Sequence, residues 1–321
     1  MNYKYEVSVV IVCMNNITQL CGCLNSIFNN THKVNYEVLL VAYFFSKENL
    51  EFLEQNYPWV KIIISDEIRG FSANNNLALR NATGKYCFVL NDDTYFFTPV
   101  IDELYETIES VPDASLVSPK ILTPQGLTQY SGIPPISWID WLLILYKLKR
   151  EKMDKTGKYI REEGLFKTYN ILGAAFIINT SFFRNLGFFY ERYFYGPEDK
   201  ALSTTMNKSG FYCYVNADII LYHIGGATGG SNTKTVCATR PAERKGSVIM
   251  MSEGKLYRKI IMSSLVWLNS FLWSFGWMIK FLFGNKTAKY SLIANINVCQ
   301  TIFSKEDTTS IFKRFYEFKK K

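Results

Sequence analysis

Residues 6–118 alternate between two hydrophobic patterns. Short, mainly apolar runs rich in β-branched residues stand at 7–13, 36–42, 60–64 and 85–90. Between these runs, apolar residues recur at helical spacing, as Leu20, Leu24 and Ile27 do. Such alternation predicts strands joined by helices, and strands that are apolar on both faces predict a parallel sheet covered on both sides. The chain is therefore predicted to be an α/β protein.

Local signals predict several helix ends. Ser46 and Ser72 stand before helical patterns as N-caps, and Pro99 begins a pattern that runs through Ile108. Residues 138–150 also look helical, whereas 149–163 is dense in charge and predicts an exposed, flexible loop. Further strands and helices are predicted at 169–179, 181–186, 195–210, 211–215 and 218–223.

Residues 260–279 form a stretch of twenty residues without a charge. Twenty residues can cross a bilayer core of roughly 30 Å, but serines, an asparagine and three tryptophans are more typical of a membrane interface. An interfacial or re-entrant helix, a spanning helix and a buried core helix all remain open. Because basic residues flank the stretch on both sides, we expect 256–321 to be a basic, aromatic helical region that associates with an anionic membrane surface.

Composition narrows the class of partner. A net charge of +8 with 48% hydrophobic residues describes a globular chain that attracts an anionic partner. Nucleic acid is disfavoured, because the basic residues gather beside an apolar segment and not along a stripe with base-stacking aromatics. Cys21 and Cys23 have no second pair at zinc spacing, and the seven cysteines indicate no disulfide framework, so a reducing cytosol is the expected location.

The stretch "YCFVLNDDTYFF" (86–97) ends an apolar strand on two adjacent carboxylates, Asp92 and Asp93. In open parallel sheets, ligands bind at the carboxyl ends of the strands. By itself, the triplet Asn91-Asp92-Asp93 fits either a surface turn or a site for a divalent cation.

The longer segment "GFSANNNLALRNATGKYCFVLNDDTYF" (70–96) resembles family 2 glycosyltransferases of the GT-A fold, especially the rhamnosyltransferase-like members of cell-surface polysaccharide pathways. That family runs Gly-Phe, Asn-Asn, Ala-x-Gly, a hydrophobic strand, then D-x-D or N-x-D. Residues 173–228, with a Glu-Asp pair and a later histidine, are similar to its acceptor half. The resemblance covers roughly 6–228. It implies a Rossmann-like mixed sheet with helices on both faces, here followed by a C-terminal helical extension.

The resemblance assigns roles at these strand ends. Asp93 falls on the family's metal position, where Mg²⁺ or Mn²⁺ holds the donor diphosphate. Asn91 and Asp92 are expected to contact the nucleotide. His223 can complete the metal or diphosphate site and would favour Mn²⁺, although a histidine that caps a strand end is the structural alternative. A loop closing over the diphosphate is expected at the glycines 225, 226, 229 and 230.

Glu198 and Asp199 open the predicted helix 195–210, where an acidic pair is also expected for capping alone. In the family this pair supplies the catalytic base, so the resemblance gives that role to Asp199, with Glu198 as its supporting neighbour. Inverting transfer requires the base within about 3 Å of the acceptor hydroxyl.

Other polar and aromatic residues are weaker candidates. Arg69, Asn74 and Asn75 precede the metal motif and are candidates for nucleotide or sugar contacts, with helix capping and solvated surface as the alternative. Four aromatic residues are candidates for stacking on acceptor sugars, with core or lipid contact as the simpler interpretation: Trp138, Trp141, Tyr193 and Tyr195.

The chain also departs from the family pattern. Ala42 and Tyr43 stand where relatives carry Asp-Asn or Asp-Asp, whose Asp recognises the uracil or thymine ring. The base contact must then come from backbone, from Tyr43 stacking or from another residue. Ala201 and Thr205 replace a frequent Asp and Arg, and Tyr190 replaces the Asp of the family's F-D-E turn.

We therefore expect 1–255 to be an inverting, metal-dependent GT-A glycosyltransferase at the inner face of the cell membrane. It would move a hexosyl or deoxyhexosyl group from a nucleotide-diphosphate sugar to a glycan or lipid-linked acceptor in cell-surface polysaccharide synthesis. One alternative is a protein of the same fold that binds nucleotide or glycan without turnover. Another is a membrane-associated scaffold whose functional part is the basic region 256–321.

Overall fold

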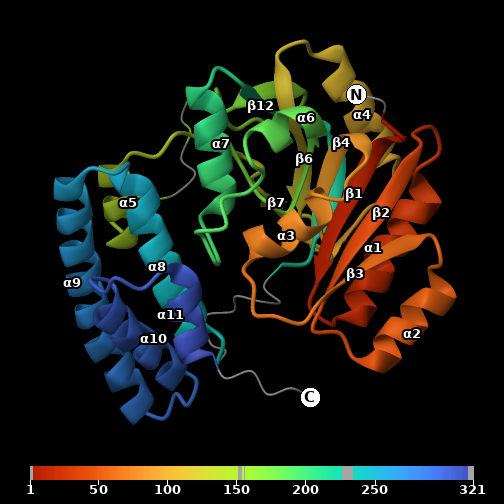
Figure 1. The fold of residues 1–321 in the computed structure, drawn as a ribbon. Coiled ribbons are helices and arrows are strands. Elements are labelled where there is room, and N and C mark those ends of the chain that lie inside the picture. The colour runs from red at the N-terminus through yellow and green to blue at the C-terminus, as the bar shows by residue number, and fades with distance from the viewer. Residues whose placement is uncertain (1–2, 151–153, 155, 226–233, 317–321) are drawn as a thin grey trace.

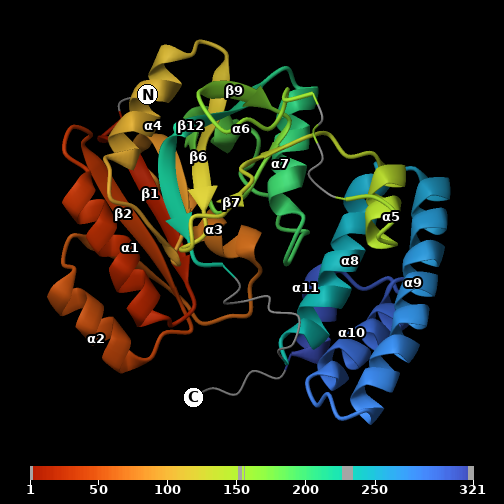
Figure 2. The ribbon, with the colours of Figure 1, turned by 180° about the vertical axis from the view of Figure 1, so that it is seen from behind.

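The computed structural model describes residues 3–150, 154, 156–225 and 234–316. An α/β part with one large sheet lies beside a bundle built from the helices that follow residue 234 (Figures 1 and 2). All the residues predicted to carry chemistry belong to the α/β part, so the sheet is described first.

The large sheet of the described chain has ten strands. Its main path, in spatial order, consists of β3 (Val60–Ser65), β2 (Tyr36–Tyr43), β1 (Tyr5–Cys13), β4 (Gly84–Asn91), β11 (Ala175–Asn179), β6 (Ala114–Leu122), β12 (Tyr212–His223) and β5 (Thr94–Tyr95). Off this path, β7 (Thr128–Gln129) pairs with β6 and β9 (Leu165–Thr168) pairs with β12, while β8 (Gly132–Ile133) and β10 (Asn170–Ile171) form a separate pair.

The strands β1 to β4 are parallel, as predicted from their apolar sequences, whereas β11 runs antiparallel to β4. The sheet is therefore mixed. Because β2 and β3 lie on one side of β1 and β4 lies on the other, the strand order reverses between β1 and β4. Such a switch point leaves a crevice at the carboxyl ends of the two strands.

Helices cover both faces of the sheet, and each face has its own apolar core. On one face lie α1 (Ile17–Asn30), α2 (Lys47–Asn56) and α4 (Val100–Ser110), packed on the β1 side chains Val7, Val9 and Ile11. On the other lie α3 (Phe71–Leu79), α6 (Thr180–Asn185) and α7 (Glu198–Lys208), whose core includes Phe183, Leu202 and Met206.

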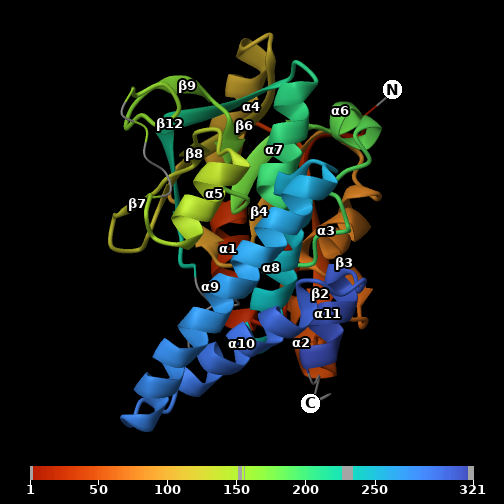
Figure 3. The same ribbon diagram turned by 90° about the vertical axis from the view of Figure 1, so that its left-hand side faces the viewer.

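The bundle consists of α8 (Val236–Ser252), α9 (Leu256–Leu282), α10 (Ala288–Thr301) and α11 (Thr308–Phe315). α10 packs on α8 and α9, α11 packs on α8, and α5 (Trp138–Leu145) packs on α9. In Figure 3, the far ends of α9 and α10 project beyond the α/β part. The bundle thus meets the α/β part through α5, α8 and α11.

α9 is the one helix of the described chain that is long and apolar enough to cross a membrane. Only 28% of its most apolar window is buried, so the rest of the described chain does not cover it as a core helix.

Several predicted boundaries differ from the structure. The strand predicted at 169–179 is divided into β10 and β11, and the helix predicted at 138–150 ends at Leu145. α3 begins at Phe71 with Gly70 as its N-cap, and Ser72 is buried inside the helix. The chain needs glycine there, because a Cβ on Gly70 would lie 2.2 Å from the carbonyl oxygen of Phe194. The strands predicted at 211–215 and 218–223 are one strand, β12, whose register on β6 shifts between Asn216 and Ile220.

The charged segment predicted as a flexible loop is only partly visible, since residues 151–153 and 155 lie outside the described residues. In the described part, Asp154 accepts backbone hydrogen bonds from Thr156, Tyr159 and Ile160.

Candidate active site

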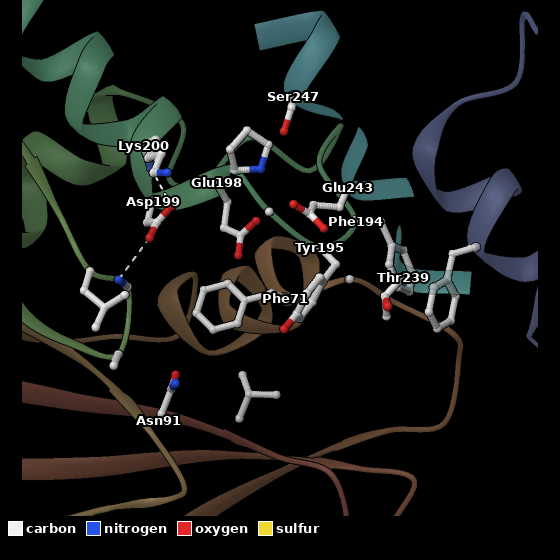
Figure 4. Close-up of a pocket in the computed structure, with 18 of the residues that line it drawn as sticks. Phe71, Asn91, Phe194, Tyr195, Glu198, Asp199, Lys200, Thr239, Glu243 and Ser247 are labelled. Carbon is white, nitrogen blue, oxygen red and sulfur yellow. Dashed lines mark hydrogen bonds between the residues drawn. The ribbon is translucent and has the colours of Figure 1, made fainter. Parts of the chain in front are cut away.

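A cavity of about 1050 Å³ opens between the carboxyl ends of β1 and β4, the start of α7 and the helices α8 and α11. Seven of the residues predicted from the sequence as site residues line it: Arg69, Asn91, Asp92, Asp93, Glu198, Asp199 and His223. Figure 4 shows Glu198 pointing into the space between α7 and Asn91, with Glu243 of α8 beside it. Strand ends and helix starts thus bring distant parts of the chain to one cavity.

Asp93 and His223 form a pair at the floor of this cavity. Nε2 of His223 lies 3.2 Å from Oδ1 of Asp93. Asp93 is buried, and its Oδ2 accepts a hydrogen bond of 3.1 Å from the backbone N–H of Gly225. Gly225 adopts a left-handed φ of +69° that favours glycine. The other glycines of the predicted closing loop, 226, 229 and 230, lie outside the described residues.

Gln129 fixes the tautomer of His223. Its Nε2 donates to the carbonyl oxygen of His223 at 2.9 Å, so its Oε1 is the atom that accepts from Nδ1 of the imidazole at 2.8 Å. A proton on Nδ1 leaves the lone pair of Nε2 facing Asp93 and the amide nitrogen of Asn91, 3.4 Å away.

A lone pair facing a carboxylate oxygen is stabilised when a cation or a proton lies between them. The donor set of one carboxylate and one imidazole therefore fits a divalent cation. Within the described chain, no cluster of three or more His, Cys, Asp or Glu side chains forms such a site. Two protein ligands are sufficient where phosphate oxygens and water supply the remaining positions.

Asn91 and Asp92 complete this floor. Burial raises the pKa of Asp92 to about 6, and the neighbouring charge of Asp93 adds to the rise, while the thiol of Cys13 lowers it. A carboxyl group in this state carries less negative charge toward an incoming diphosphate than an exposed aspartate does.

Glu198 and Asp199 form the second acidic pair, on the wall made by α7. Asp199 accepts backbone hydrogen bonds from Lys200 (2.7 Å) and Gly173 (3.2 Å). Glu198 differs, because its Oε2 is shielded from solvent and has no hydrogen-bond partner in the described chain. Burial raises the pKa of both groups, and the charge of Asp199 helps to raise the pKa of Glu198 to about 8. Glu198 is then protonated at neutral pH, whereas the two backbone N–H groups that donate to Asp199 favour the ionised form of that carboxyl group.

The polar residues before the metal motif separate into two groups. Arg69 and Asn74 line the cavity, and Nε of Arg69 is buried without a partner in the described chain. Asn75, the next residue on α3, does not line the cavity. Its side chain is buried, and its Nδ2 donates to the carbonyl oxygen of Phe71. The structure therefore does not bring Asn75 to the predicted nucleotide contact.

The aromatic candidates separate as well. Trp141 and Tyr195 line the cavity, whereas Tyr193 is fully buried in the core. Trp138 lies in an apolar surface groove of about 360 Å³ between α5 and α9.

Two of the residues at which the chain departs from the family pattern, Tyr190 and Thr205, contact each other. The hydroxyl groups of Tyr190 and Thr205 lie 3.3 Å apart at hydrogen-bond distance. Tyr190 and Thr205 thus replace the charged residues that relatives often carry at these positions with a neutral pair. This contact holds the turn before α7 against the helix.

Several residues that line the cavity or hold a residue that lines it were not predicted from the sequence. Gln129 lies on the two-residue strand β7, which has no periodicity to detect. Thr239, Glu243, Ser247, Phe312 and Tyr316 come from α8 and α11. The apolar and basic composition of the C-terminal region predicted a contact with a membrane and contains no pattern that indicates a contribution to the cavity.

Comparisons with known proteins agree with this geometry. The model of the family described as glycosyl transferase family 2 matches residues 8–166. The O-antigen biosynthesis protein RfbC of Myxococcus xanthus is 25% identical over 221 residues, which is 68% of this chain. The match spans only 17% of that protein's length.

Two solved structures share the fold. GalNAc-T7 with UDP, GalNAc and Mn²⁺ has a TM-score of 0.54 at 18% identity, covering 68% of this chain and 43% of its own. The mannosyltransferase PcManGT from Pyrobaculum calidifontis, in complex with GDP-Man and Mn²⁺, has a TM-score of 0.53 at 13% identity, covering 95% and 89%. These likenesses confirm the predicted GT-A fold.

Proposed function

We propose that the chain is an inverting glycosyltransferase of family 2, from the match of that family's model to residues 8–166 and from the geometry of the cavity. It moves a hexosyl or deoxyhexosyl group from a nucleotide-diphosphate sugar to a hydroxyl group of a glycan or lipid-linked acceptor. One observation carries the proposal: the Asp93–His223 pair and the Glu198–Asp199 pair line the same cavity from different walls.

In this proposal Asp199 is the catalytic base. The acceptor oxygen attacks the anomeric carbon, its proton passes to Asp199, and the bond from the anomeric carbon to the diphosphate oxygen breaks with both electrons leaving on the nucleoside diphosphate. The backbone N–H groups of Gly173 and Lys200 orient Asp199. Glu198, protonated at neutral pH, offers an O–H to the substrate from its unpartnered oxygen.

Asp93 and His223 would hold the divalent cation. A Mg²⁺ or Mn²⁺ ion bound there supplies Lewis-acid stabilisation of the charge on the departing nucleoside diphosphate. Gln129 holds the Nδ1–H of His223, so that Nε2 is the nitrogen available for ligation, and Gly225 holds the second oxygen of Asp93. Asn91 and Arg69 add uncharged and cationic donors toward the nucleotide.

A role in cell-surface polysaccharide synthesis is supported by the similarity to the O-antigen biosynthesis protein RfbC. The seven free cysteines suit a reducing compartment, in keeping with a cytoplasmic enzyme.

Attachment to a membrane is supported by the way in which α9 is oriented. Its outward side is largely apolar, and the outward residues include Trp267, Leu268, Phe271, Leu272 and Phe275. Its side toward the protein carries both apolar and polar residues: Met262, Ser263, Val266, Asn269 and Ser270. A water-soluble helix exposes a polar face instead. We propose that this outward face of α9, with the basic residues at its ends, lies on the anionic inner face of the cell membrane.

The proposal is tested by incubating the enzyme with UDP-, dTDP- and GDP-sugars, Mn²⁺ and membrane lipid extract, and measuring nucleoside diphosphate release. Glycosyl transfer predicts release that requires the lipid extract. A protein that binds without turnover would be stabilised by a nucleotide sugar in thermal unfolding and release nothing.

A further inference from the structure

The nucleotide end of the cavity lacks the carboxylate by which relatives recognise the base. Ala42 is fully buried at the end of β2, and the next residue, Tyr43, lines the cavity. The hydroxyl of Tyr43 accepts a hydrogen bond of 3.2 Å from the backbone N–H of Arg69 and is therefore already engaged. Burial raises the pKa of Tyr43 to about 12, so its phenol is neutral. Among the described residues that line the β2 end of the cavity, none therefore offers an anionic side chain to a base.

The position of this end relative to the metal pair follows from the strand order. Asp93 follows β4, while Tyr43 ends β2 and Arg69 follows β3. Two inter-strand steps, β4 to β1 and β1 to β2, correspond to about 10 Å. An extended nucleoside diphosphate with its phosphates at Asp93 therefore places its base near Tyr43.

Helix α11 closes this same end of the cavity with aromatic rings. Phe312 stacks on Phe194 with ring centroids 3.9 Å apart, and Tyr316 stacks on Phe312 at 4.7 Å. Phe194, Phe312 and Tyr316 all line the cavity, as Tyr43 does. The hydroxyl of Tyr316 is close enough to Tyr43 to contribute to the rise of its pKa, after burial.

Hydrogen bonds at the start of α11 fix this wall in place. Oγ1 of Thr308 donates to the carbonyl oxygen of Arg192 at 2.8 Å and accepts from the backbone N–H of Phe194 at 3.0 Å. The carbonyl oxygen of Phe194 accepts in turn from the N–H of Phe71 at the start of α3. α11 and the α/β part are therefore joined at the point where the stacked rings begin.

We infer that α11 forms the wall of a nucleobase subsite, in which the base of the donor stacks against Tyr316 over the Phe312–Phe194 stack. This inference rests on the proposed function. Stacking recognises the π-face of a base and requires no carboxylate, so the wall replaces the contact that is lost at Ala42. The region after 256 then serves the donor site as well as the membrane.

The test is the affinity of the enzyme for UDP, dTDP and GDP with Mn²⁺, measured by titration calorimetry. Tyr316→Ala removes the ring. For each nucleotide that the wild-type enzyme binds, the Kd is expected to rise about tenfold, which is the size of effect that the loss of one base–aromatic stack produces. Tyr316→Phe retains the ring and is expected to bind as wild type does. Tyr316→Leu preserves apolar volume without the ring and is expected to behave as Tyr316→Ala does, which keeps the test valid if the alanine variant unfolds.

Two controls make the outcome specific. Phe303→Ala removes an exposed ring (59% exposed) of the same bundle that does not line the cavity, and binding should not change. Inorganic pyrophosphate has no base, so its affinity should be the same in wild type and Tyr316→Ala.

Equal nucleotide affinities in wild type, Tyr316→Ala and Tyr316→Leu would overturn the inference and leave the proposed function intact. Parallel losses for nucleotides and pyrophosphate would also overturn it, because they would indicate general damage to the cavity. A wild-type enzyme that binds none of the three nucleotides would overturn the proposed function and the inference together.

Discussion

Nε2 of His223 lies 3.2 Å from Oδ1 of Asp93, and Gln129 accepts a hydrogen bond from the opposite nitrogen of the same ring at 2.8 Å. His223 ends β12, Asp93 follows β4 and Gln129 ends β7. These residues are distant in sequence, so they are brought together by the fold and not by a local motif. This arrangement prepares a carboxylate and an imidazole lone pair for one cation. It also makes Gln129 a positioning residue whose contribution can be measured.

Gln129→Leu removes the acceptor of the His223 N–H and leaves the ring free to change tautomer and orientation. We expect Mn²⁺ affinity in the presence of UDP to fall by about 10- to 100-fold, as is typical of lost outer-shell partners of metal ligands. Titration of Mn²⁺ monitored by electron paramagnetic resonance checks this directly. Gln125→Leu, on the exposed turn nearby, is the matched control and should leave Mn²⁺ affinity unchanged. Identical affinities in the two variants would remove Gln129 from the site.

The two acidic residues on α7 should differ in their kinetic effects. Asp199→Asn removes the ionised base and is expected to lower kcat by about 10²- to 10⁴-fold. Glu198→Gln resembles the protonated glutamate and should lower kcat less. Steady-state kinetics of both variants at pH 7 measure the order. A larger loss in Glu198→Gln than in Asp199→Asn would transfer the role of base to Glu198.

Glu198 also predicts how folding stability depends on pH. Its pKa is raised from 4.5 to about 8 in the folded chain, so between these values the folded state keeps a proton that the unfolded state releases. Because the unfolded state then binds fewer protons, the free energy of unfolding decreases as pH rises from 5 to 8. Urea unfolding across this range should show a flatter pH dependence in Glu198→Gln than in wild type. Equal slopes would mean that Glu198 is already ionised in the folded protein.

The sequence predicted the sheet well, because β1, β2 and β4 are buried on both faces and their apolar runs are easily recognised. It predicted Asp93 and His223 through a resemblance in motif order. It could not find Gln129, since a residue on a two-residue strand carries no pattern. It also predicted Asn75 at the site, but the side chain of α3 that lines the cavity is that of the preceding residue, Asn74.

Long-range packing explains the remaining differences. The aromatic wall of α11 depends on the contact between Phe312 and Phe194, which are 118 positions apart in the sequence. The helix predicted to have Ser72 as its N-cap has Gly70 in that position, where the backbone of Phe194 leaves no room for a Cβ. Neither contact leaves a local signal.

Membrane attachment through α9 predicts a charge-sensitive surface. The double change Phe271→Glu and Leu272→Glu puts two carboxylates on the outward face of the helix and should abolish sedimentation with phosphatidylglycerol vesicles. Wild-type binding should weaken on phosphatidylcholine vesicles and at high salt, since the basic flanks act by electrostatic attraction.

Leu127→Glu is the control for this experiment, because it changes an exposed leucine (67% exposed) of the α/β part. It should sediment as wild type does. Undiminished binding of the α9 double variant would show that another surface contacts the lipid.

The most direct test of the central claim is Mn²⁺-dependent release of nucleoside diphosphate from a nucleotide sugar, compared between wild type and Asp93→Asn. A cation shared by Asp93 and His223 predicts release that stops with EDTA, returns with Mn²⁺ and falls by about 100-fold or more in the variant, while the fold, checked by thermal unfolding, is retained. Release by Asp93→Asn at the wild-type rate, or wild-type release that EDTA does not affect, would contradict the account.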